Sequence, residues 1–464
     1  MSGGFACHRG IWAAMLTALR NYATPPSSLA GRLSMQSLLF ATGEGAFLAG
    51  SAVYFGIILG LSLGQVGIGL TVGAAASFLV AVPTGKLVDH FGPKRMWSLS
   101  AVLQGALFLA WPFIDSFPQF IVLAVVMEVA GSLGGAAHGA YVLDVLPPGE
   151  RVESRAYMYS ALNVGFSVGA FLGGGAIAFG PEVLRWAPVL TAALFMVNAV
   201  AILRLPDASH DVRTDEPRRR PEGPPAIRNL SWFGVTFLTG VLWSNQVLLH
   251  TVIPLWLVIE TDAPHELVAV LFATNTLMCI VLPRVTSRGI RDIDTALRAV
   301  RLSAAFFALT CVVTLATHET VGWVTVVLFF IGHIVLTWAE LYLSASGWTF
   351  EAELMDPRRR GDYQGVSELG NTLGRFWAPA VYGFLAMEWG AFGWLTIAAI
   401  VGVAAAAMHP TTRAGRRYLE KHVPPDVLVD ARAGAREEEA PTPSTTLSEP
   451  LDPGTTITDT PLPR

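Results

Sequence analysis

Cysteine, charged residues and the short motifs of soluble enzymes are scarce in this sequence of 464 residues. Its three cysteines, Cys7, Cys279 and Cys311, have separations that suit neither a disulfide framework nor a metal site. The sequence contains no glycine-rich phosphate loop ending in Gly-Lys-Ser or Gly-Lys-Thr, and no nucleophile elbow. We therefore expect a protein that is not an enzyme, hydrolyses no ATP and needs no cofactor or metal.

Charged residues make up only 14% of the chain, whereas a soluble globular protein carries ~25%. Hydrophobic residues make up 52%, and long blocks of sequence hold almost no charge. The basic residues lie in loops rather than on one folded face, so nucleic acid is not an expected partner. This composition indicates a polytopic membrane protein.

Apolar runs of membrane length recur along the chain. A helix needs about 20 mainly apolar residues to cross a bilayer. Twelve such runs are present, at residues 35–59, 66–84, 96–114, 118–143, 157–179, 186–205, 230–258, 266–286, 299–317, 321–347, 365–387 and 391–408. Only Glu388 marks the boundary between the last two. We predict an all-α integral membrane protein with twelve transmembrane helices.

A polar segment at residues 206–229 divides these runs into six and six. It is rich in proline, arginine and acidic residues and cannot bury a core, so we interpret it as a flexible cytoplasmic linker. Its Arg218–Arg220 cluster either contacts anionic lipid headgroups or only sets the topology. The predicted parts are an N-terminal tail (1–33), a first half (34–205), the linker (206–229), a second half (230–408) and a disordered tail (409–464).

Arginine and lysine fall almost entirely in the even-numbered links between the runs. These links hold Lys86, Lys94, Arg95, Arg151, Arg155, Arg218–Arg220, Arg284, Arg288, Arg291 and Arg358–Arg360. The odd-numbered links hold a single base, Arg185, and several acids. By the positive-inside rule, both termini are expected in the cytoplasm, with the helices in the plasma membrane.

The short polar link between the second and third runs carries the most specific pattern. It reads Gly-x-x-x-Asp-x-x-Gly-x-Lys-Arg and contains Gly85, Asp89, Gly92, Lys94 and Arg95. This link resembles the loop between helices 2 and 3 of the major facilitator superfamily of secondary transporters. One position departs from the family, because His90 stands where a basic residue usually follows the aspartate. A basic turn that only sets the topology is the alternative.

The resemblance implies two six-helix halves, built from inverted three-helix repeats, around a central cavity lined by helices 1, 4, 7 and 10. It also implies that the link acts as a gate. Asp89 would lie at the cytoplasmic end of helix 2 and face the start of helix 11 near Gly365. A carboxylate is favoured at a helix N-terminus, so this contact is expected to hold the outward-open state.

Two further stretches extend the resemblance. Gly165, Gly169, Gly173 and Gly174 resemble the helix-5 signature of the superfamily's antiporters, with Ala170 in place of its proline. Glycines four residues apart let another helix approach closely, so packing alone also accounts for them. Residues 356–365 resemble the arginine–glycine link before helix 11 in the drug:proton antiporter branch. That branch often has an arginine in helix 4, near where this chain has Glu128.

Ionisable and polar residues inside the predicted membrane helices are candidates for binding protons or substrate. The ionisable ones are Glu44, Glu128, Glu340 and Arg375, and helix 7 adds Trp243, Asn245 and Gln246. An intramembrane charge is costly and marks a functional site by default. Glu340 has an alternative role in a structural ion pair with Arg375. The helix-7 residues, like His138 and His333, fit hydrogen bonding between helices equally well.

We therefore predict a secondary transporter that exports small amphipathic or cationic organic compounds in exchange for protons by alternating access. A metabolite importer or facilitator of the same fold is the alternative, with the acids binding substrate rather than protons. A non-transporting membrane receptor is a third hypothesis. The expected partners are a small-molecule substrate, protons and the lipid bilayer, and the chain is expected to be a monomer.

Overall fold

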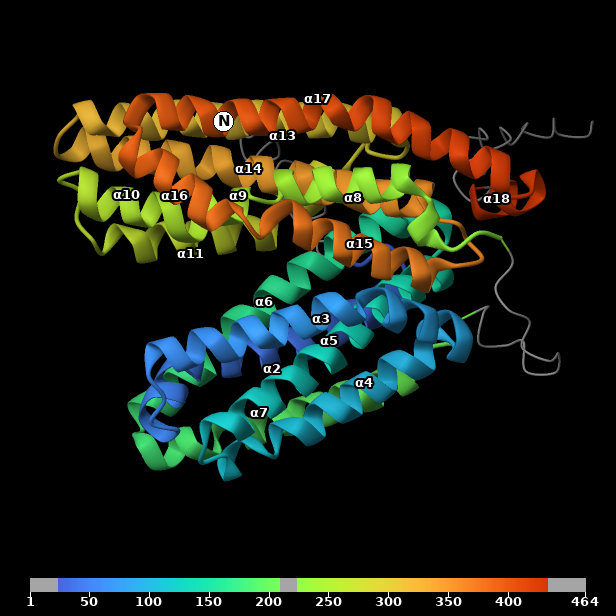
Figure 1. The fold of residues 1–464 in the computed structure, drawn as a ribbon, viewed down its shortest axis with the longest axis horizontal. Coiled ribbons are helices and arrows are strands. Elements are labelled where there is room, and N and C mark those ends of the chain that lie inside the picture. The colour runs from blue at the N-terminus through green and yellow to red at the C-terminus, as the bar shows by residue number, and fades with distance from the viewer. Residues whose placement is uncertain (1–23, 209–222, 433–464) are drawn as a thin grey trace, which may run out of the picture.

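A computed structural model describes residues 24–208 and 223–432, and the regular structure of these residues is entirely helical (Figure 1). The helices of the first half are α2 (Ser28–Val53), α3 (Leu63–Phe91), α4 (Pro93–Phe108), α5 (Phe117–Val145), α6 (Arg151–Ala178) and α7 (Pro181–Leu203). The second half contains α8 (Leu230–Leu242), α9 (Asn245–Val247), α10 (Ile253–Glu260), α11 (Leu267–Val281), α12 (Pro283–Ser287), α13 (Ile293–Ala316), α14 (Trp323–Leu354), α15 (Arg360–Arg375), α16 (Ala378–Glu388), α17 (Gly390–His422) and α18 (Pro425–Arg432).

Ten helices within the described residues are long and apolar enough to cross a membrane. They correspond to ten of the twelve predicted runs. The runs at 266–286 and 365–387 are broken instead: α11 and α12 meet at Pro283, and α15 and α16 meet at Phe376 and Trp377. A proline cannot donate the backbone hydrogen bond that continues a helix, which explains the first break. The count of twelve spans therefore stays a prediction.

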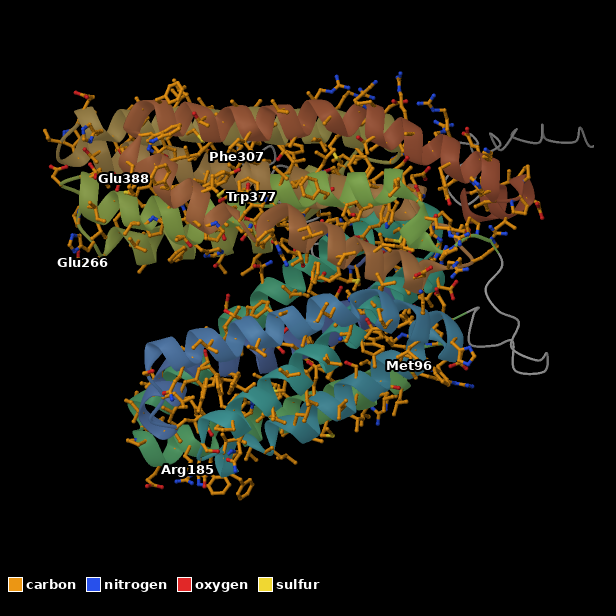
Figure 2. The ribbon with its side chains drawn as sticks, in the orientation of Figure 1. Met96, Arg185, Glu266, Phe307, Trp377 and Glu388 are labelled. Carbon is orange, nitrogen blue, oxygen red and sulfur yellow. The ribbon has the colours of Figure 1, made fainter. Side chains whose placement is uncertain are left out.

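The two halves form separate bundles that meet at one end and diverge towards the other (Figure 1). The end where they meet contains the start of α15, α18 and the described ends of the linker, and we call it the linker end. We call the opposite end the far end. Arg185, Glu266 and Glu388 lie at the far end, whereas Met96 lies towards the linker end (Figure 2).

The first half is held together by an unusually close contact between α2 and α6. Gly165, Gly169 and Gly173 all face α2, and a Cβ atom on any of them would lie 2.4 Å from one of its carbonyl oxygens. Only glycine permits two helix backbones to approach so closely. Gly174 lies on another face of α6, where nothing is within 4 Å of a Cβ. Three of the four predicted glycines therefore form this contact.

The first helix begins earlier than the predicted start of the first half at residue 34. Ser27 caps α2, because its side-chain oxygen accepts a hydrogen bond from the N–H of Ala30 at 3.2 Å. Ala30 and Leu33 are fully buried, so this turn belongs to the folded half rather than to a tail. Cys7 and the Arg218–Arg220 cluster lie outside the described residues.

The expectation of a disordered tail from residue 409 is wrong for much of the segment. Helix α17 continues to His422, and α18 follows it. Thr412, Gly415 and Leu419 are buried at helical spacing, while the arginines between them are exposed. Such an amphipathic stripe has a low mean hydropathy, so a search for uniformly apolar runs misses it.

The α2–α6 contact predicts that replacing one of its glycines with alanine lowers the stability of the protein. In Gly169→Ala the new methyl group would meet the carbonyl oxygen of Thr42 in α2. Overpacking of this kind costs about 1–3 kcal/mol, so we expect the variant to unfold several degrees below the unmodified protein. Thermal unfolding in detergent, followed by circular dichroism, would measure the shift. Gly174→Ala is the matched control, and equal melting temperatures for the two variants would contradict the packing role.

Candidate functional site

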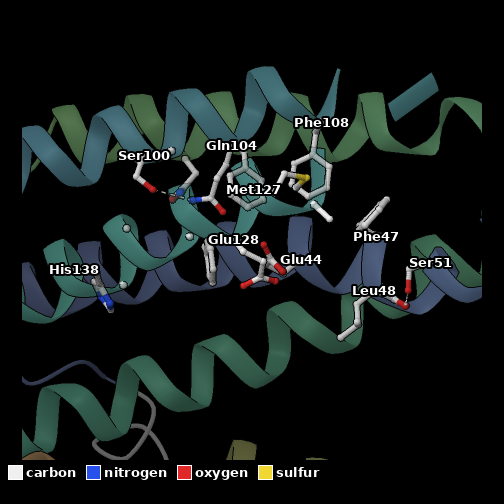
Figure 3. Close-up of a pocket in the computed structure, with 18 of the residues that line it drawn as sticks. Glu44, Phe47, Leu48, Ser51, Ser100, Gln104, Phe108, Met127, Glu128 and His138 are labelled. Carbon is white, nitrogen blue, oxygen red and sulfur yellow. Dashed lines mark hydrogen bonds between the residues drawn. The ribbon is translucent and has the colours of Figure 1, made fainter. Parts of the chain in front are cut away.

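A cavity of about 500 Å³ lies inside the first half, mainly between α2, α4, α5 and α7 (Figure 3). Its lining changes along its length. Aromatic rings line the part nearer the far end, from Phe47, Phe55, Phe108, Trp111 and Phe120. Glu44 and Glu128 lie at the middle, and neutral polar groups line the part nearer the linker end, from Gln36, Ser37, Ser100, His138 and Asn198.

Glu44 and Glu128 come from different helices, and their carboxylates point towards one another in Figure 3. Glu44 lies between two glycines of α2 that both pack against neighbouring helices. A Cβ on Gly43 would lie 3.1 Å from an aromatic ring of α7, and a Cβ on Gly45 would lie 2.7 Å from a carbonyl oxygen of α6. The side chain between these packed faces enters the cavity. No lysine or arginine is among the described residues that line it.

Apart from His138, sequence reasoning missed the neutral polar residues of this cavity. Gln36 donates a hydrogen bond from Nε2 to Oδ1 of Asn198 at 3.0 Å. Gln104 donates from Nε2 to Oγ of Ser100 at 2.9 Å, which joins two turns of α4. One signal was present in the sequence, because Gln36 precedes Glu44 by about two helical turns and therefore lies close to the same face. The partners on α4 and α7 carried no such signal.

Glu340 lies outside the cavity, at a contact between the two halves. It is buried, with 4% exposure, and accepts a hydrogen bond from the Tyr159 hydroxyl of α6 at 2.7 Å. The Asn275 amide of α11 donates to its other oxygen at 3.0 Å, and the Cys279 thiol lies at 3.7 Å. Because Tyr159 belongs to the first half, this carboxylate bridges the halves.

The three candidate glutamates therefore do not share one site. The structure brings Glu44 and Glu128 together and leaves Glu340 elsewhere, whereas a single cavity lined by helices 1, 4, 7 and 10 was expected. The alternative pairing of Glu340 with Arg375 is wrong as well. Arg375 is half-exposed and lies 4.0 Å from Glu368 in its own helix, a pair that contributes little to stability.

The polar patch of helix 7 lies at the break between α8 and α10, apart from the first-half cavity. Asn245 is buried, and its Oδ1 has no hydrogen-bond partner among the described residues. Gln246 lies 3.2 Å from His250, one turn further along. Trp243 lines a separate cavity of about 90 Å³ between α8, α14 and α15. The structure gives these three residues no common site.

The linker end is closed by a contact between α3 and α15. Asp89, at the end of α3, is buried and accepts hydrogen bonds from two backbone N–H groups of α15. Its Oδ1 lies 2.7 Å from the nitrogen of Gly361, and its Oδ2 lies 2.8 Å from that of Asp362. The first N–H groups of a helix have no partner inside it and carry the positive end of its dipole. The carboxylate supplies both the missing acceptor and the opposite charge.

Two glycines of the same motif shape this contact. A Cβ on Gly85 would lie 2.2 Å from the carbonyl oxygen of Gly361, so the two halves touch through their backbones. Gly92 has a φ of 95°, a left-handed value that glycine adopts without strain, and it turns the chain from α3 into α4.

The basic residues of the motif act within the first half. Lys94 donates hydrogen bonds to the carbonyl oxygen of Leu205 and to Oδ1 of Asp207, both at 2.7 Å. This hydrogen bond and the charge of the ammonium group lower the pKa of the Asp207 carboxyl. Arg95 and His90 are exposed. The lysine therefore ties the start of the linker to α4, and the gating role predicted for the motif rests on Asp89 and Gly85.

Ion pairs surround this contact and also cross between the halves. Arg360 of α15 lies 3.1 Å from Asp144 of α5. The other pairs join α6 to the second half, through Arg155 with Glu351 and through Arg284 with Glu153. Each half supplies acids and bases, so separating the halves would leave several charges without partners. The polar closure thus consists of the Asp89 contact and ion pairs that involve five helices, α5, α6, α12, α14 and α15.

A family model described as the Major Facilitator Superfamily matches residues 33–379. Among curated proteins, a Na(+), Li(+), K(+)/H(+) antiporter of Planococcus maritimus is 26% identical over 75% of this chain and 86% of its own length. Multidrug resistance protein MdtH of Aeromonas hydrophila is 24% identical over 74% of this chain and 83% of its own.

Solved structures support the same fold. The FucP transporter in the outward conformation superposes with a TM-score of 0.64 at 14% identity, covering 83% of this chain and 97% of its own. A bacterial homologue of the iron transporter ferroportin in its outward-facing state also gives 0.64, at 15% identity, covering 85% and 100%. At these identities the likeness concerns the fold alone.

The Asp89 contact predicts a measurable change in the separation of the halves. Asp89→Ala removes the acceptor for two N–H groups and the charge at the start of α15, so we expect the linker end to open. Spin labels at His90→Cys and Glu420→Cys, which are exposed positions in different halves, would report a longer distance by double electron–electron resonance. Asp115→Ala, at an exposed far-end position, is the control; an unchanged distance distribution in Asp89→Ala would refute the closing role.

Proposed function

Because this chain belongs to the major facilitator superfamily of transporters, we propose that it exports small amphipathic or cationic organic compounds in exchange for protons. The observation that carries the proposal is the pairing of Glu44 and Glu128 in a cavity whose described lining holds no lysine or arginine. Two carboxylates that face each other repel one another, and a positive partner between them relieves that repulsion. A proton or a cationic substrate supplies that charge.

The aromatic part of the cavity suits the remainder of such a substrate. Rings of Phe47, Phe55 and Trp111 lie within about 6 Å of one another and form a continuous apolar wall beside the acids. Aromatic faces bind both apolar groups and organic cations. A compound with one positive charge and an apolar body therefore matches both parts of the cavity. The names of the two curated relatives, an antiporter and a multidrug resistance protein, are consistent with this substrate class.

Exchange follows from competition for the same carboxylates. Arrival of a cationic substrate displaces a proton from Glu44 or Glu128, and that proton leaves to the solution from which the substrate came. On the other side of the membrane, a proton from solution binds the same carboxylate and displaces the substrate, which leaves the cavity. Each unit of charge that enters the cavity is thus matched by one that leaves it, which avoids an unpaired buried charge.

Glu340 is suited to link protonation to the movement of the halves. While the linker end is closed, the Glu340 carboxylate accepts hydrogen bonds from both halves. The donors are Tyr159 of the first half and Asn275 of the second. Separation of the halves would remove the Tyr159 donor and leave this carboxylate with partners from the second half only. We assign Glu340 a role in conformational coupling rather than in substrate binding.

The proposal also includes the orientation of the protein in the membrane. The basic residues of the linker end would lie in the cytoplasm under the positive-inside rule, with both termini on that side of the plasma membrane. Closure of this end by Asp89 then corresponds to an outward-open state of a twelve-helix transporter. Since the cavity is built from one chain, a monomer suffices for transport.

A monovalent metal cation is a second candidate substrate. One curated relative is named as a Na(+), Li(+), K(+)/H(+) antiporter, and it covers three quarters of this chain. Oxygen ligands from two carboxylates and neighbouring amide and hydroxyl groups suit hard cations. The aromatic wall has no role in that case, so the substrate assay should include both classes.

Proton movement in reconstituted vesicles would test the proposal. With a pH-sensitive dye inside and an imposed inside-acid gradient, a lipophilic quaternary ammonium or an alkali cation that is exchanged should collapse the gradient faster than in vesicles without the protein. We expect Glu44→Gln and Glu128→Gln to slow this collapse at least 10-fold, since each removes a proton-binding group, and Glu340→Gln to slow it as well. Glu388→Gln, exposed at the far end, is the control.

The results also distinguish the alternatives. Full activity in all three glutamine variants would exclude proton coupling through these acids. Uptake of a labelled compound with no change in pH would indicate a facilitator, with the glutamates binding only substrate. Collapse by sodium or potassium but not by the quaternary ammonium would favour the metal-cation exchanger.

A further inference from the structure

We infer that the linker-end part of the first-half cavity is a separate subsite for a neutral hydrogen-bond donor on the transported compound. The preferred substrates would then be elongated amines that carry a hydroxyl or amide group distant from the charge. The identity of the cation rests on the proposed function, whereas the subsite rests on the polar groups described next.

The first of these groups is the side-chain amide of Gln36. The residue is almost completely buried, with 3% exposure, and so is its partner Asn198, with 1%. The Gln36 Nε2 group donates to Asn198, which leaves Oε1 enclosed and without a partner among the described residues. Buried polar atoms are nearly always hydrogen-bonded, and an unsatisfied one is costly. This oxygen therefore favours a ligand that brings an N–H or O–H group.

The second group is the imidazole of His138. Its ring packs on Trp97 with centroids 4.8 Å apart, which holds its plane in one orientation. Its Nε2 is enclosed and also has no partner among the described residues. The other polar side chains here are already satisfied, because Ser100 donates to the carbonyl oxygen of Ala130 and accepts from Gln104. The linker-end part of the cavity thus carries two enclosed polar atoms without partners among the described residues, one from α2 and one from α5.

The distance between this subsite and the acids sets the length of the ligand. Gln36 and Glu44 are eight residues apart on α2, which corresponds to ~12 Å along the helix axis. His138 and Glu128 are ten residues apart on α5, which corresponds to ~15 Å. A compound that reaches both parts needs a spacer of this length between its amine and its donor group. All four residues line the same cavity.

The subsite is unsuited to an anionic group on the ligand. Its lining contains amide, hydroxyl and imidazole groups, and no lysine or arginine is among the described lining residues. An anionic group placed here would be desolvated with no cation to pair with. A neutral donor satisfies Gln36 without bringing a second charge.

Two probes that differ in a single group test this inference. Decylamine and its ω-hydroxy derivative have the same charge and the same chain, and the chain has about the required length. We expect the unmodified, full-length protein to bind the hydroxylated amine about 10-fold more tightly, as measured by titration calorimetry in detergent. In Gln36→Met this ratio of dissociation constants should fall to about one, and in His138→Phe it should fall as well.

The ratio serves as the readout because a general loss of stability lowers both affinities together. Gln119→Met is the matched control, since Gln119 is exposed in the first turn of α5 and outside the cavity. Equal affinity for the two amines in the unmodified protein, absence of binding by both, or a ratio that survives in both variants would overturn the subsite.

Failure of the subsite can be separated from failure of the proposed function. If the hydroxylated amine binds more tightly but neither amine collapses a pH gradient faster than in protein-free vesicles, the subsite stands and proton exchange is wrong. If both amines collapse the gradient faster than in protein-free vesicles, with equal apparent affinity, exchange stands and the subsite is wrong.

Discussion

The contact of Asp89 with the first N–H groups of α15 determines how the two halves sit together. It places a negative charge where a helix offers two unpaired donors and a positive dipole end, and Gly85 lets the backbones approach closely enough to form it. Ion pairs between the two halves add further polar interactions to this contact. A hydrogen bond to a charged group contributes only about 1.5–3 kcal/mol net, because water can replace the partner. A closure of this kind is specific in geometry and still reversible, as the proposed alternating access would require.

The helices within the first half, in contrast, are held together by tight apolar packing. The glycines of α6 bring it against the backbone of α2, and buried aromatic rings fill the far-end part of the first half. Separation of such surfaces would lose the dense van der Waals packing that holds membrane helices together. The cavity with Glu44 and Glu128 is lined by helices of the same half, so its shape should persist in the proposed movement of the halves. Glu340 is placed to respond to that movement, because its donors come from both halves.

Several features were predictable because they depend on local sequence. The apolar runs follow from the cost of exposing backbone and charge to lipid, and ten of them appear as membrane-length helices. The motif around Asp89 was recognisable because its glycines and its carboxylate are needed at fixed spacing in one turn. The extension of α17 to His422 was missed because buried and charged positions alternate at helical spacing, which leaves no apolar run. The breaks in α11–α12 and α15–α16 depend on tertiary packing as well as on proline.

The sequence by itself determined the all-helical class, the division into two halves and the presence of costly acids inside apolar segments, since each reflects the composition of a continuous stretch. Only the tertiary structure decided which of those acids meet. Glu44 and Glu128 are 84 positions apart, yet they share a cavity because α2 and α5 pack in the same half. Glu340 pairs with Tyr159 rather than Arg375 because α6 and α14 meet between the halves. Helix rotation and packing set these contacts, and neither is encoded in the spacing of residues along one segment.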